Sequence, residues 1–467
     1  MWDSAKTAEI LNGKLYGSPS AYFHGCAIDS RKVTEGEIFV AIRGENTDGH
    51  RFISNAYEAG AAIVIAEEER MVEGGIPEVP AGRALIAVGD SIAALQKLAK
   101  TWRIELNALV VGITGSSGKT TTKDMIAAVL AKKYRVHKNM ENYNNEIGLP
   151  LTILSTPRGT EIMVLEMGMR GLGQINALCD VCSPSIGVIT NIGTTHMELL
   201  GSQEKITQAK WELIDNLPRD GTAVLNSEDY LSVGKASSLR IKKLFYGIKG
   251  EYIKPDIQGS DIQAAGALET IFQANMGDEN SRVNLPLPGE HNVLDALAAL
   301  AVGRICGVSL EKGASALEEF KLSKMRLEII KGISDSIIIN DVYNANPASM
   351  RASLNVLAER GGEKTIAILG EMYELGDASV LGHSEVGQAA ARLGIRELVT
   401  VGKLAQDIAQ GALDAGLNSQ RVHICEDCDQ AVAITRQLLE GMESNTWILI
   451  KGSRGMKMER ASDKLKV

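Results

Sequence analysis

Short apolar runs alternate with segments of helical periodicity through most of this chain. The runs are ALVVGI (108–113), EIMVLEM (161–167), SIGVITNI (185–192) and GTAVLN (221–226), and later SIIIND (336–341), TIAILG (365–370), ELVTVG (397–402) and TWILIKG (446–452). Buried parallel strands are apolar along their whole length, and each needs a crossover helix before the next. The alternation therefore predicts an α/β fold with mainly parallel sheets.

Two changes in this rhythm predict domain boundaries. A chain of 467 residues exceeds what one hydrophobic core normally organises. The first hundred residues mix charges and glycines, as in DSRKVTEGEIFVAIRGENTDGHRFI, and LEEFKLSKMRLEII ends a helical pattern in charged residues before a new strand series. We expect a small α/β domain at 1–106, a second domain at 107–320 and a third at 321–467, with a hinge around Phe320 to Arg326.

Composition narrows the class of protein. The formal net charge of -9 argues against a nucleic-acid-binding protein, which normally presents a basic face. The first residues, MWDSAKTAEILNG, lack the basic and apolar regions of a signal peptide, and apolar runs such as AAIVIA are too short to span a bilayer. We expect a cytoplasmic monomer without membrane insertion.

Two Cys-x-x-Cys pairs raise the question of a zinc site. Cys179 and Cys182 form one pair, and Cys425 and Cys428 form the other. Zinc ribbons usually place such pairs about 15 to 20 residues apart, whereas these pairs belong to different predicted domains. Buried or unreactive thiols are the preferred interpretation.

The stretch VVGITGSSGKTTTKDMIAAVL (110–130) leads from a strand through a glycine-rich turn into a helix. Two glycines allow the backbone to approach phosphate oxygens, the Lys supplies a cation to the β- and γ-phosphates, and the first Thr after it can bind Mg2+. The usual loop has four residues between its first Gly and its Gly-Lys pair, and here there are two. The residues expected to bind ATP here are Thr114, Gly115, Ser116, Ser117, Gly118, Lys119, Thr120 and Thr121.

The helix that follows this loop is expected to be amphipathic. Met125, Ile126, Val129 and Leu130 share one face of a 3.6-residue period. The amide groups at its N-terminus would point at the bound anion.

Three further residues are candidates for chemistry. Glu166 ends an apolar run, where a carboxylate could hold the metal that Thr120 touches. His196 follows the next run, and the carboxyl ends of parallel strands are where such sheets bind ligands. Lys210 lies further along, on a predicted helix. Taken alone, each has an ordinary interpretation as a solvated charge, a structural His or a surface Lys, so only the combination indicates a site.

The stretch DVYNANPASM (341–350) comes directly before another predicted helix. Its Asn-Pro pair fits a simple turn between a strand and a helix. Its density of polar side chains also suits recognition of a ribose or a base, and the residues alone leave both interpretations open.

Eight stretches in order along the chain resemble the Mur ligases of bacterial cell-wall synthesis. They are GITGSSGKTT, NYNNEIGLPLTIL, LEMGMRGLGQI, TNIGTTHMELLGS, QAKWEL, PGEHNVLDALAA, DVYNANPASM and LIKGSRGMKME. The resemblance implies an N-terminal domain that binds a uridine nucleotide, a central P-loop ATPase domain and a mobile C-terminal Rossmann-like domain. It also explains the short loop, because Mur ligases use the form T-G-x-x-G-K-T.

The resemblance further implies an ATP-dependent amide ligase with ATP and Mg2+ as cofactors. Transfer of the γ-phosphoryl group would activate the terminal carboxylate of UDP-N-acetylmuramoyl-tripeptide (UDP-MurNAc-tripeptide) as an acyl phosphate. The amine of D-alanyl-D-alanine would then attack, giving UDP-MurNAc-pentapeptide, ADP and phosphate. The stretches YNANP and GSRGMKME favour this dipeptide-adding member of the family.

The family pattern assigns roles at the reaction centre. Lys119, Glu166, His196 and Lys210 are the expected catalytic residues. Thr120 would bind Mg2+ between the β- and γ-phosphates, while Glu166 and a neutral His196 would serve a second metal near the acyl phosphate. Lys210 occupies the position where relatives carry a carbamylated lysine, whose anion can help to hold that metal.

The same pattern assigns residues to the substrates. Around the nucleotide it places Arg326 near the phosphates, Asp341 on the ribose, Asn292 at the adenine, and Tyr343 and Asn346 beside them. Asp295 stands where relatives often have a second Asn, so its role is left open. The UDP end would contact Ser30 and Arg31, and the peptide would lie near Asn142, Asn145, Glu146 and Arg170.

Two other functions compete with this interpretation. A sibling ligase would add a single amino acid, as the diamino-acid-adding enzymes and folylpolyglutamate synthases do. The diamino-acid-adding enzymes usually carry an Asp-Asn-Pro-Arg stretch, which this sequence does not contain. A nucleotide-dependent switch would have no need for Glu166, His196 and Lys210 beside a substrate domain.

Overall fold

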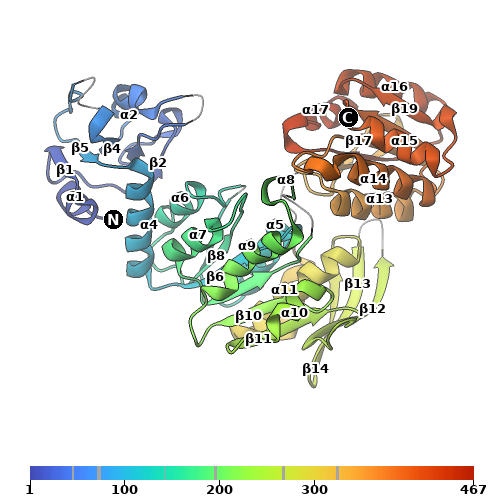
Figure 1. The fold of residues 1–467 in the computed structure, drawn as a ribbon, viewed down its shortest axis with the longest axis horizontal. Coiled ribbons are helices and arrows are strands. Elements are labelled where there is room, and N and C mark those ends of the chain that lie inside the picture. The colour runs from blue at the N-terminus through green and yellow to red at the C-terminus, as the bar shows by residue number, and fades with distance from the viewer. Residues whose placement is uncertain (45–46, 71–74, 141, 194–196, 266–268, 322–324) are drawn as a thin grey trace.

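Three sheets organise the chain, each within one of the predicted ranges (Figure 1). The computed structural model describes residues 1–467 except 45–46, 71–74, 141, 194–196, 266–268 and 322–324. The predicted α/β fold with three domains is confirmed. The precise boundaries stay predictions, and residues 322–324 of the predicted hinge lie outside the described residues.

The first sheet has five strands in the order β1-β5-β4-β3-β2, and only β1 runs antiparallel to its neighbour. Its strands are β1 (Lys14–Gly17), β2 (Cys26–Ala27), β3 (Ile38–Val40), β4 (Ile63–Glu67) and β5 (Ala84–Val88). Its helices are α1 (Ser4–Leu11), α2 (Ile53–Glu58) and α4 (Ser91–Leu106), with 3-10 turns at η1 (Ser30–Lys32) and η2 (Gly49–Phe52).

The second sheet has nine strands in the order β14-β13-β12-β11-β10-β9-β6-β8-β7. Its parallel part is β6 (Leu109–Thr114), β7 (Val136–Lys138), β8 (Ile162–Glu166), β9 (Ile186–Ile189), β10 (Thr222–Asn226), β11 (Lys242–Gly247) and β12 (Ile257–Ala265). An antiparallel extension is formed by β13 (Glu269–Met276) and β14 (Glu279–Leu285). The phosphate-loop strand β6 lies between β8 and β9, so the residues that follow these three strands meet at one edge.

Helices cover both faces of this second sheet. Alternate residues point to opposite faces, so Val110 packs into a core with α6 and α7 whereas Val111 packs into one with α5 and α11. The helices are α5 (Lys119–Ala131), α6 (Gly148–Leu154), α7 (Gln174–Cys182), α8 (Met197–Leu200), α9 (Gln203–Asp215), α10 (Tyr230–Ala236), α11 (Glu290–Ile305) and α12 (Leu310–Glu318).

Helix α5 is more buried than its sequence pattern predicts. The apolar face is confirmed, since Met125, Ile126, Val129 and Leu130 are buried. Residues 120–124, polar throughout, are buried as well, because α11, β7, β8 and the residue after β7 pack around the first turns of α5. The predicted amphipathic character is therefore wrong for the first turns of α5, where polar residues serve the phosphate loop instead of solvent.

The third sheet has six strands in the order β15-β16-β20-β17-β18-β19, parallel except for the edge strand β15. The strands are β15 (Glu328–Lys331), β16 (Ile337–Asp341), β17 (Thr365–Gly370), β18 (Glu397–Val401), β19 (Val422–Cys425) and β20 (Trp447–Lys451). The helices are α13 (Pro347–Gly361), α14 (Ser379–Arg392), α15 (Gln406–Asp414), α16 (Cys428–Glu440) and α17 (Glu459–Leu465), with short turns at η3 (Ile333–Asp335), η4 (Gly376–Ala378), η5 (Ser419–Arg421) and η6 (Arg454–Met456).

The first and third sheets flank the second on opposite sides (Figure 1). Helix α4 joins the first two sheets into one continuous hydrophobic core. Trp102 on α4 is buried, its Nε1 donates to the Thr156 carbonyl at 3.1 Å, and the Trp2 ring meets it edge-on at 5.7 Å between centroids. Among the described helices, none has the length and apolar character needed to cross a membrane.

The two cysteine pairs lie in different parts of this fold. Cys179 and Cys182 pack in the core shared by the first two sheets, and Cys425 and Cys428 pack in the third. Burial raises the pKa of Cys179 to about 12 and that of Cys425 to about 11. These positions agree with the interpretation of the four cysteines as buried thiols.

Candidate active site

The phosphate loop requires glycine at two positions. A Cβ at Gly115 would collide with the Thr190 hydroxyl, and one at Gly118 would lie 2.6 Å from Asp295 Oδ1. Gly118 also has a φ of 78°, in the left-handed region that other residues rarely adopt. The loop is therefore in close contact with the end of β9 on one side and with α11 on the other.

Residues that follow β9 fix the conformation of the phosphate loop. Thr190 Oγ1 donates to the Ser117 carbonyl at 2.6 Å, and the Asn191 side chain accepts from the Ser117 amide at 3.1 Å. The Gly193 amide donates to Ser116 Oγ at 2.8 Å. These bonds hold the loop in shape before any nucleotide is bound.

Lys119 opens helix α5 and is half-buried. Its Nζ donates to the Gly115 carbonyl within the loop at 2.8 Å. Burial lowers its pKa, an effect opposed by the carboxylates of Glu166 and Glu374 and increased by Arg326. Binding of a phosphate group would replace one carbonyl contact with charged oxygens, which is a stronger interaction for an ammonium.

Glu166 and Thr120 form an oxygen-rich pair beside Lys119. Glu166 is 3% exposed at the end of β8, where Thr120 Oγ1 donates to its Oε2 at 2.7 Å. Asn144 Nδ2 donates to its Oε1 at 2.8 Å. A buried carboxylate next to a hydroxyl offers the hard oxygen ligands that Mg2+ prefers, so these residues fit the expected metal.

Lys210 lies on α9 and is 1% exposed. Burial, with a smaller contribution from the charge of Lys119, lowers its pKa well below the usual value. No described residue forms a hydrogen bond or an ion pair with its Nζ. Lys210 is therefore a buried lysine in place of the surface lysine that composition alone suggests. His196 lies outside the described residues.

Arg326 brings the C-terminal part of the chain to the phosphate loop. Its Nη2 donates to Thr120 Oγ1 at 2.9 Å, and its guanidinium lies 4.1 Å above the ring centre of Tyr343. The candidate site is therefore located where the second and third sheets meet.

Asp341 ends β16 and is tightly bound within its own domain. Lys451 Nζ lies 2.5 Å from its Oδ2, and Ser353 Oγ donates to the same oxygen at 2.6 Å. Burial alone would raise the pKa of Asp341, but the Lys451 ammonium and these hydrogen bonds hold it below the usual value. A ribose would have to share this carboxylate with Lys451.

Two other expected nucleotide residues have structural partners as well. Asn346 caps α13 by accepting from the Ser349 amide at 2.8 Å. Asn292 is buried on α11, and its Nδ2 donates to the Pro288 carbonyl at 2.7 Å. Their predicted contacts with the nucleotide stay predictions.

The expected substrate residues are more exposed. Ser30 and Arg31 lie on η1, and Arg31 pairs with Asp29 at 2.8 Å while its side chain stays 86% exposed. Those expected near the peptide lie in loops before α6 and α7 and are Asn142, Asn145, Glu146 and Arg170. Asn145 Oδ1 accepts from the Gly148 amide at 2.8 Å at the start of α6.

Sequence reasoning missed the residues that position Glu166. Asn139 is fully buried, and its side chain accepts from the Glu166 amide at 2.9 Å while donating to the Glu166 carbonyl at 3.0 Å. Lys123 Nζ in turn donates to the Asn139 carbonyl at 2.8 Å. The only signal in the sequence is the Asn-rich stretch NMENYNNE, which does not distinguish Asn139 and Asn144 from Asn142 and Asn145.

Asp295, whose role the sequence left open, lies against the phosphate loop. Its Oδ1 accepts from Thr122 Oγ1 at 2.8 Å. Burial raises its pKa to about 7, while the Thr122 hydrogen bond and the Arg326 charge oppose that increase. Asp295 is therefore a titratable group where the loop, α11 and Arg326 meet.

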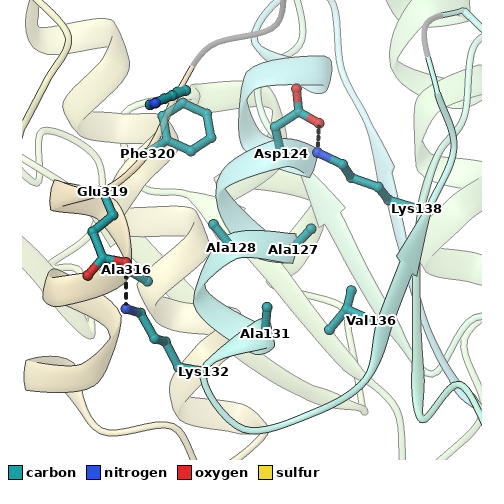
Figure 2. Close-up of a pocket in the computed structure, with 11 residues that line it drawn as sticks. Asp124, Ala127, Ala128, Ala131, Lys132, Val136, Lys138, Ala316, Glu319 and Phe320 are labelled. Atoms are coloured by element: carbon teal, nitrogen blue, oxygen red, sulfur yellow. Dashed lines mark hydrogen bonds and ion pairs between the residues drawn. The ribbon is translucent and has the colours of Figure 1, made fainter.

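A groove of about 560 Å³ lies away from these residues, between the C-terminal half of α5, α12 and β7 (Figure 2). Its floor is mostly alanine, as at Ala127 and Ala131. Lys138 pairs with Asp124 at 2.7 Å and Lys132 with Glu319 at 2.9 Å along its rim. These charges are already compensated, so the groove adds nothing to the candidate site.

Comparisons with known proteins decide the family. Three family models match the chain: "Mur ligase family, catalytic domain" over residues 22–103, "Mur ligase middle domain" over 113–303, and "Mur ligase, glutamate ligase domain" over 325–454. The chain belongs to the Mur ligase family. Among curated Mur ligases, the UDP-N-acetylmuramoyl-tripeptide–D-alanyl-D-alanine ligase of Bacillus subtilis (strain 168) is 41% identical over 459 residues, 97% of this chain and 95% of that protein.

Solved Mur ligase structures share the whole architecture. Crystal structure I of MurF from Acinetobacter baumannii has a TM-score of 0.88 and 28% identity, covering 99% of this chain and 98% of that one. MurF of Thermotoga maritima in complex with ADP has a TM-score of 0.80 and 29% identity, covering 94% and 96%. The predicted resemblance to the Mur ligases is confirmed.

Proposed function

We propose that this chain joins D-alanyl-D-alanine to UDP-MurNAc-tripeptide with hydrolysis of ATP to ADP and phosphate. The observation that carries this proposal is the assembly of Lys119, Thr120 and Glu166 with the buried Lys210 and with Arg326 from the neighbouring domain. The 41% identity to a ligase of that name supports the dipeptide-adding reaction over the single-amino-acid alternatives. A nucleotide-dependent switch has no use for this set.

The chemistry divides one difficult step into two. A carboxylate is a poor electrophile because its leaving group would be oxide, so its oxygen first takes the γ-phosphoryl group of ATP. The dipeptide amine then attacks the carbonyl carbon, the C–O bond to the phosphate breaks, and the amine loses a proton. Lys119 and Arg326 would stabilise the charge on the transferred group, which is the main contribution of protein to phosphoryl transfer.

Thr120 would hold one Mg2+ between the β- and γ-phosphates, and Glu166, His196 and a carbamylated Lys210 would hold a second one near the acyl phosphate. When bound, the metal neutralises charge on the phosphate oxygens. Carbamylation adds CO2 to the neutral amine of Lys210 and releases a proton, and the lowered pKa of Lys210 supplies that amine. If Lys210→Ala keeps full activity and added bicarbonate has no effect on the wild type, the carbamate role is wrong.

The remaining assignments follow the family pattern. Asp341, Tyr343, Asn346 and Asn292 would surround the nucleotide, with closure of the C-terminal domain excluding water from the acyl phosphate. Ser30 and Arg31 would bind the UDP end, and the four loop residues before α6 and α7 would lie near the peptide. We place the reaction in the cytoplasm, where ATP is available, and assign it to a monomer.

One assay tests the proposal. Phosphate release is measured with ATP and UDP-MurNAc-tripeptide, with and without D-alanyl-D-alanine. We expect release that depends on the dipeptide, and the same assay with lysine or diaminopimelate at the third peptide position identifies the tripeptide. Release indifferent to the dipeptide would contradict the proposal.

A further inference from the structure

Lys123, on the second turn of α5, is a buried lysine to which the proposed reaction gives no role. It is 2% exposed, and removing an ammonium from water is costly unless other groups replace its hydration. Its Nζ donates to the Asn139 carbonyl at 2.8 Å and lies 3.5 Å from Asp124 Oδ1. Lys138 pairs with the same Asp124 oxygen more closely, at 2.7 Å (Figure 2). Compensation of Asp124 therefore does not account for Lys123, which leaves the hydrogen bond to Asn139 to explain its place in the core.

The side chain of Asn139 continues the central sheet beyond the end of β7. Strand β7 ends at Lys138, which is paired with Val164 on β8. Glu166 lies two residues further along β8, where β6 is paired on its other side. The fully buried Asn139 accepts from the Glu166 amide through Oδ1 at 2.9 Å and donates from Nδ2 to the Glu166 carbonyl at 3.0 Å. A side-chain amide thus binds both main-chain groups of Glu166 after the neighbouring strand has ended, and it fixes the backbone that carries the carboxylate.

Helix α5 therefore holds Glu166 by two routes. Thr120 Oγ1 donates directly to Glu166 Oε2 at 2.7 Å. Lys123 binds the Asn139 carbonyl, and Asn139 in turn binds the Glu166 backbone. Residues three apart share one face of a helix, so both routes start from the same face of α5. Since α5 also begins at the phosphate loop, one helix connects that loop with the position of the Glu166 carboxylate.

We propose that Lys123 is a positioning residue, which anchors Asn139 and thereby fixes the Glu166 carboxylate relative to the phosphate loop. The assignment rests on the proposed function, in which Glu166 would be a ligand of the second Mg2+. Carboxylates that bind metals depend on the groups that orient them, and loss of such a group typically lowers metal affinity or activity about 10- to 100-fold. Lys123 thus acts on the Mg2+ requirement of the enzyme, and the binding of ATP does not depend on it.

The experiment compares Lys123→Met with a matched control, Lys138→Met. Both substitutions remove a cation beside Asp124 and keep an unbranched side chain, but the first also removes the hydrogen bond to the Asn139 carbonyl. Phosphate release that depends on the dipeptide is measured against free Mg2+. For Lys123→Met we expect the Mg2+ concentration at half-maximal rate to rise about tenfold, with the KM for ATP at saturating Mg2+ unchanged. Lys138→Met should leave both parameters unchanged, and an equal Mg2+ requirement in the two variants would overturn the inference.

Amide hydrogen exchange, measured without substrates or metal, gives a readout that is independent of activity. The Glu166 amide is bound to Asn139, so its exchange should become faster in Lys123→Met and keep the wild-type rate in Lys138→Met. The measurement is made far below the melting temperature of each variant, so that global unfolding does not contribute. A wild-type exchange rate at Glu166 in Lys123→Met would contradict the anchoring.

A third variant, Asn139→Ala, tests whether Lys123 acts through Asn139. Alone it should raise the Mg2+ requirement at least as much as Lys123→Met does. The double variant should raise it no further than Asn139→Ala, because both changes act on the same carboxylate. Effects that multiply in the double variant would overturn the route through Asn139. If the wild type shows no dipeptide-dependent phosphate release, the proposed function fails instead, while hydrogen exchange still decides whether Lys123 anchors Asn139.

Discussion

The two outer domains are attached to the central sheet in different ways. The N-terminal sheet shares one hydrophobic core with the central sheet through α4, with Trp2 and Trp102 in contact inside it. The C-terminal sheet has its own cores, and it meets the central domain through polar contacts such as Arg326 with Thr120 and Arg360 with the Glu269 carbonyl. The shared core makes the first attachment a fixed platform, whereas we expect the second to open and close at small cost.

This difference fits the proposed reaction. A substrate held by the N-terminal domain must present its carboxylate at a constant place, which a shared core ensures. The C-terminal domain carries Arg326, so its closure would complete the charge arrangement around the phosphate. We therefore expect the N-terminal junction to be rigid and the C-terminal junction to move.

The largest expected effect is at the fixed junction. Trp102→Ala removes a buried indole together with its hydrogen bond to Thr156, so we expect a loss of about 3 to 5 kcal/mol in the free energy of unfolding. Urea denaturation measures this loss in the free energy of unfolding. Trp102→Phe keeps a ring and should lose less, and equal losses in the two variants would argue against packing as the cause.

At the junction between the central and C-terminal domains, we expect a substitution to change activity. Arg326→Ala removes a cation beside Thr120, and we expect kcat to fall about 100- to 1000-fold. Stability should change little, because the two domains have separate hydrophobic cores. The measurement pairs steady-state phosphate release with thermal unfolding, and Arg326→Lys serves as the control that keeps the charge. Full activity of the Ala variant would remove Arg326 from the phosphate site.

Asp295 gives a test through pH. Its folded pKa of about 7 lies above the usual 3.8 because of burial, so its contribution to stability is fully present below the unfolded pKa and is lost as the pH rises toward 7. Asp295→Asn removes this dependence. The variant should gain stability relative to the wild type between pH 4 and 7, by at most about 1.4 kcal/mol per pH unit. Parallel melting profiles of the two proteins from pH 4 to 8 would contradict the raised pKa.

The smallest structural effect is expected at the N-terminal surface. Arg31→Ala removes an exposed ion pair with Asp29, and exposed pairs contribute little to stability. We expect an unchanged melting temperature and an unchanged kcat, with the KM for UDP-MurNAc-tripeptide raised about tenfold. A normal KM would show that η1 does not hold the UDP end.

The sequence predicts the fold well where a local pattern determines the structure. The apolar runs predict the parallel strands, and the glycines predict the turn of the phosphate loop, where the structure leaves room for glycine alone beside Thr190 and Asp295. The same patterns do not predict that Thr120 to Asp124 are buried, since their partners, such as Glu166 and Asp295, lie far along the chain.

The candidate site is predicted less completely, for a similar reason. Lys119, Glu166 and Lys210 follow from motifs, but the support of Glu166 by Asn139 depends on a turn that no periodicity reveals. The hydrogen bond from Arg326 to Thr120 depends on the approach of two domains, which no local pattern records. Tertiary contacts, and not local propensity, decide such residues.

The central claim is the ligation of a dipeptide, and product analysis tests it most directly. The purified protein is incubated with ATP, Mg2+, UDP-MurNAc-tripeptide and D-alanyl-D-alanine, and the nucleotide-linked product is identified by mass spectrometry. The account predicts UDP-MurNAc-pentapeptide, formed in equal amount with ADP and phosphate. Phosphate released without pentapeptide, or a product extended by a single amino acid, would contradict it.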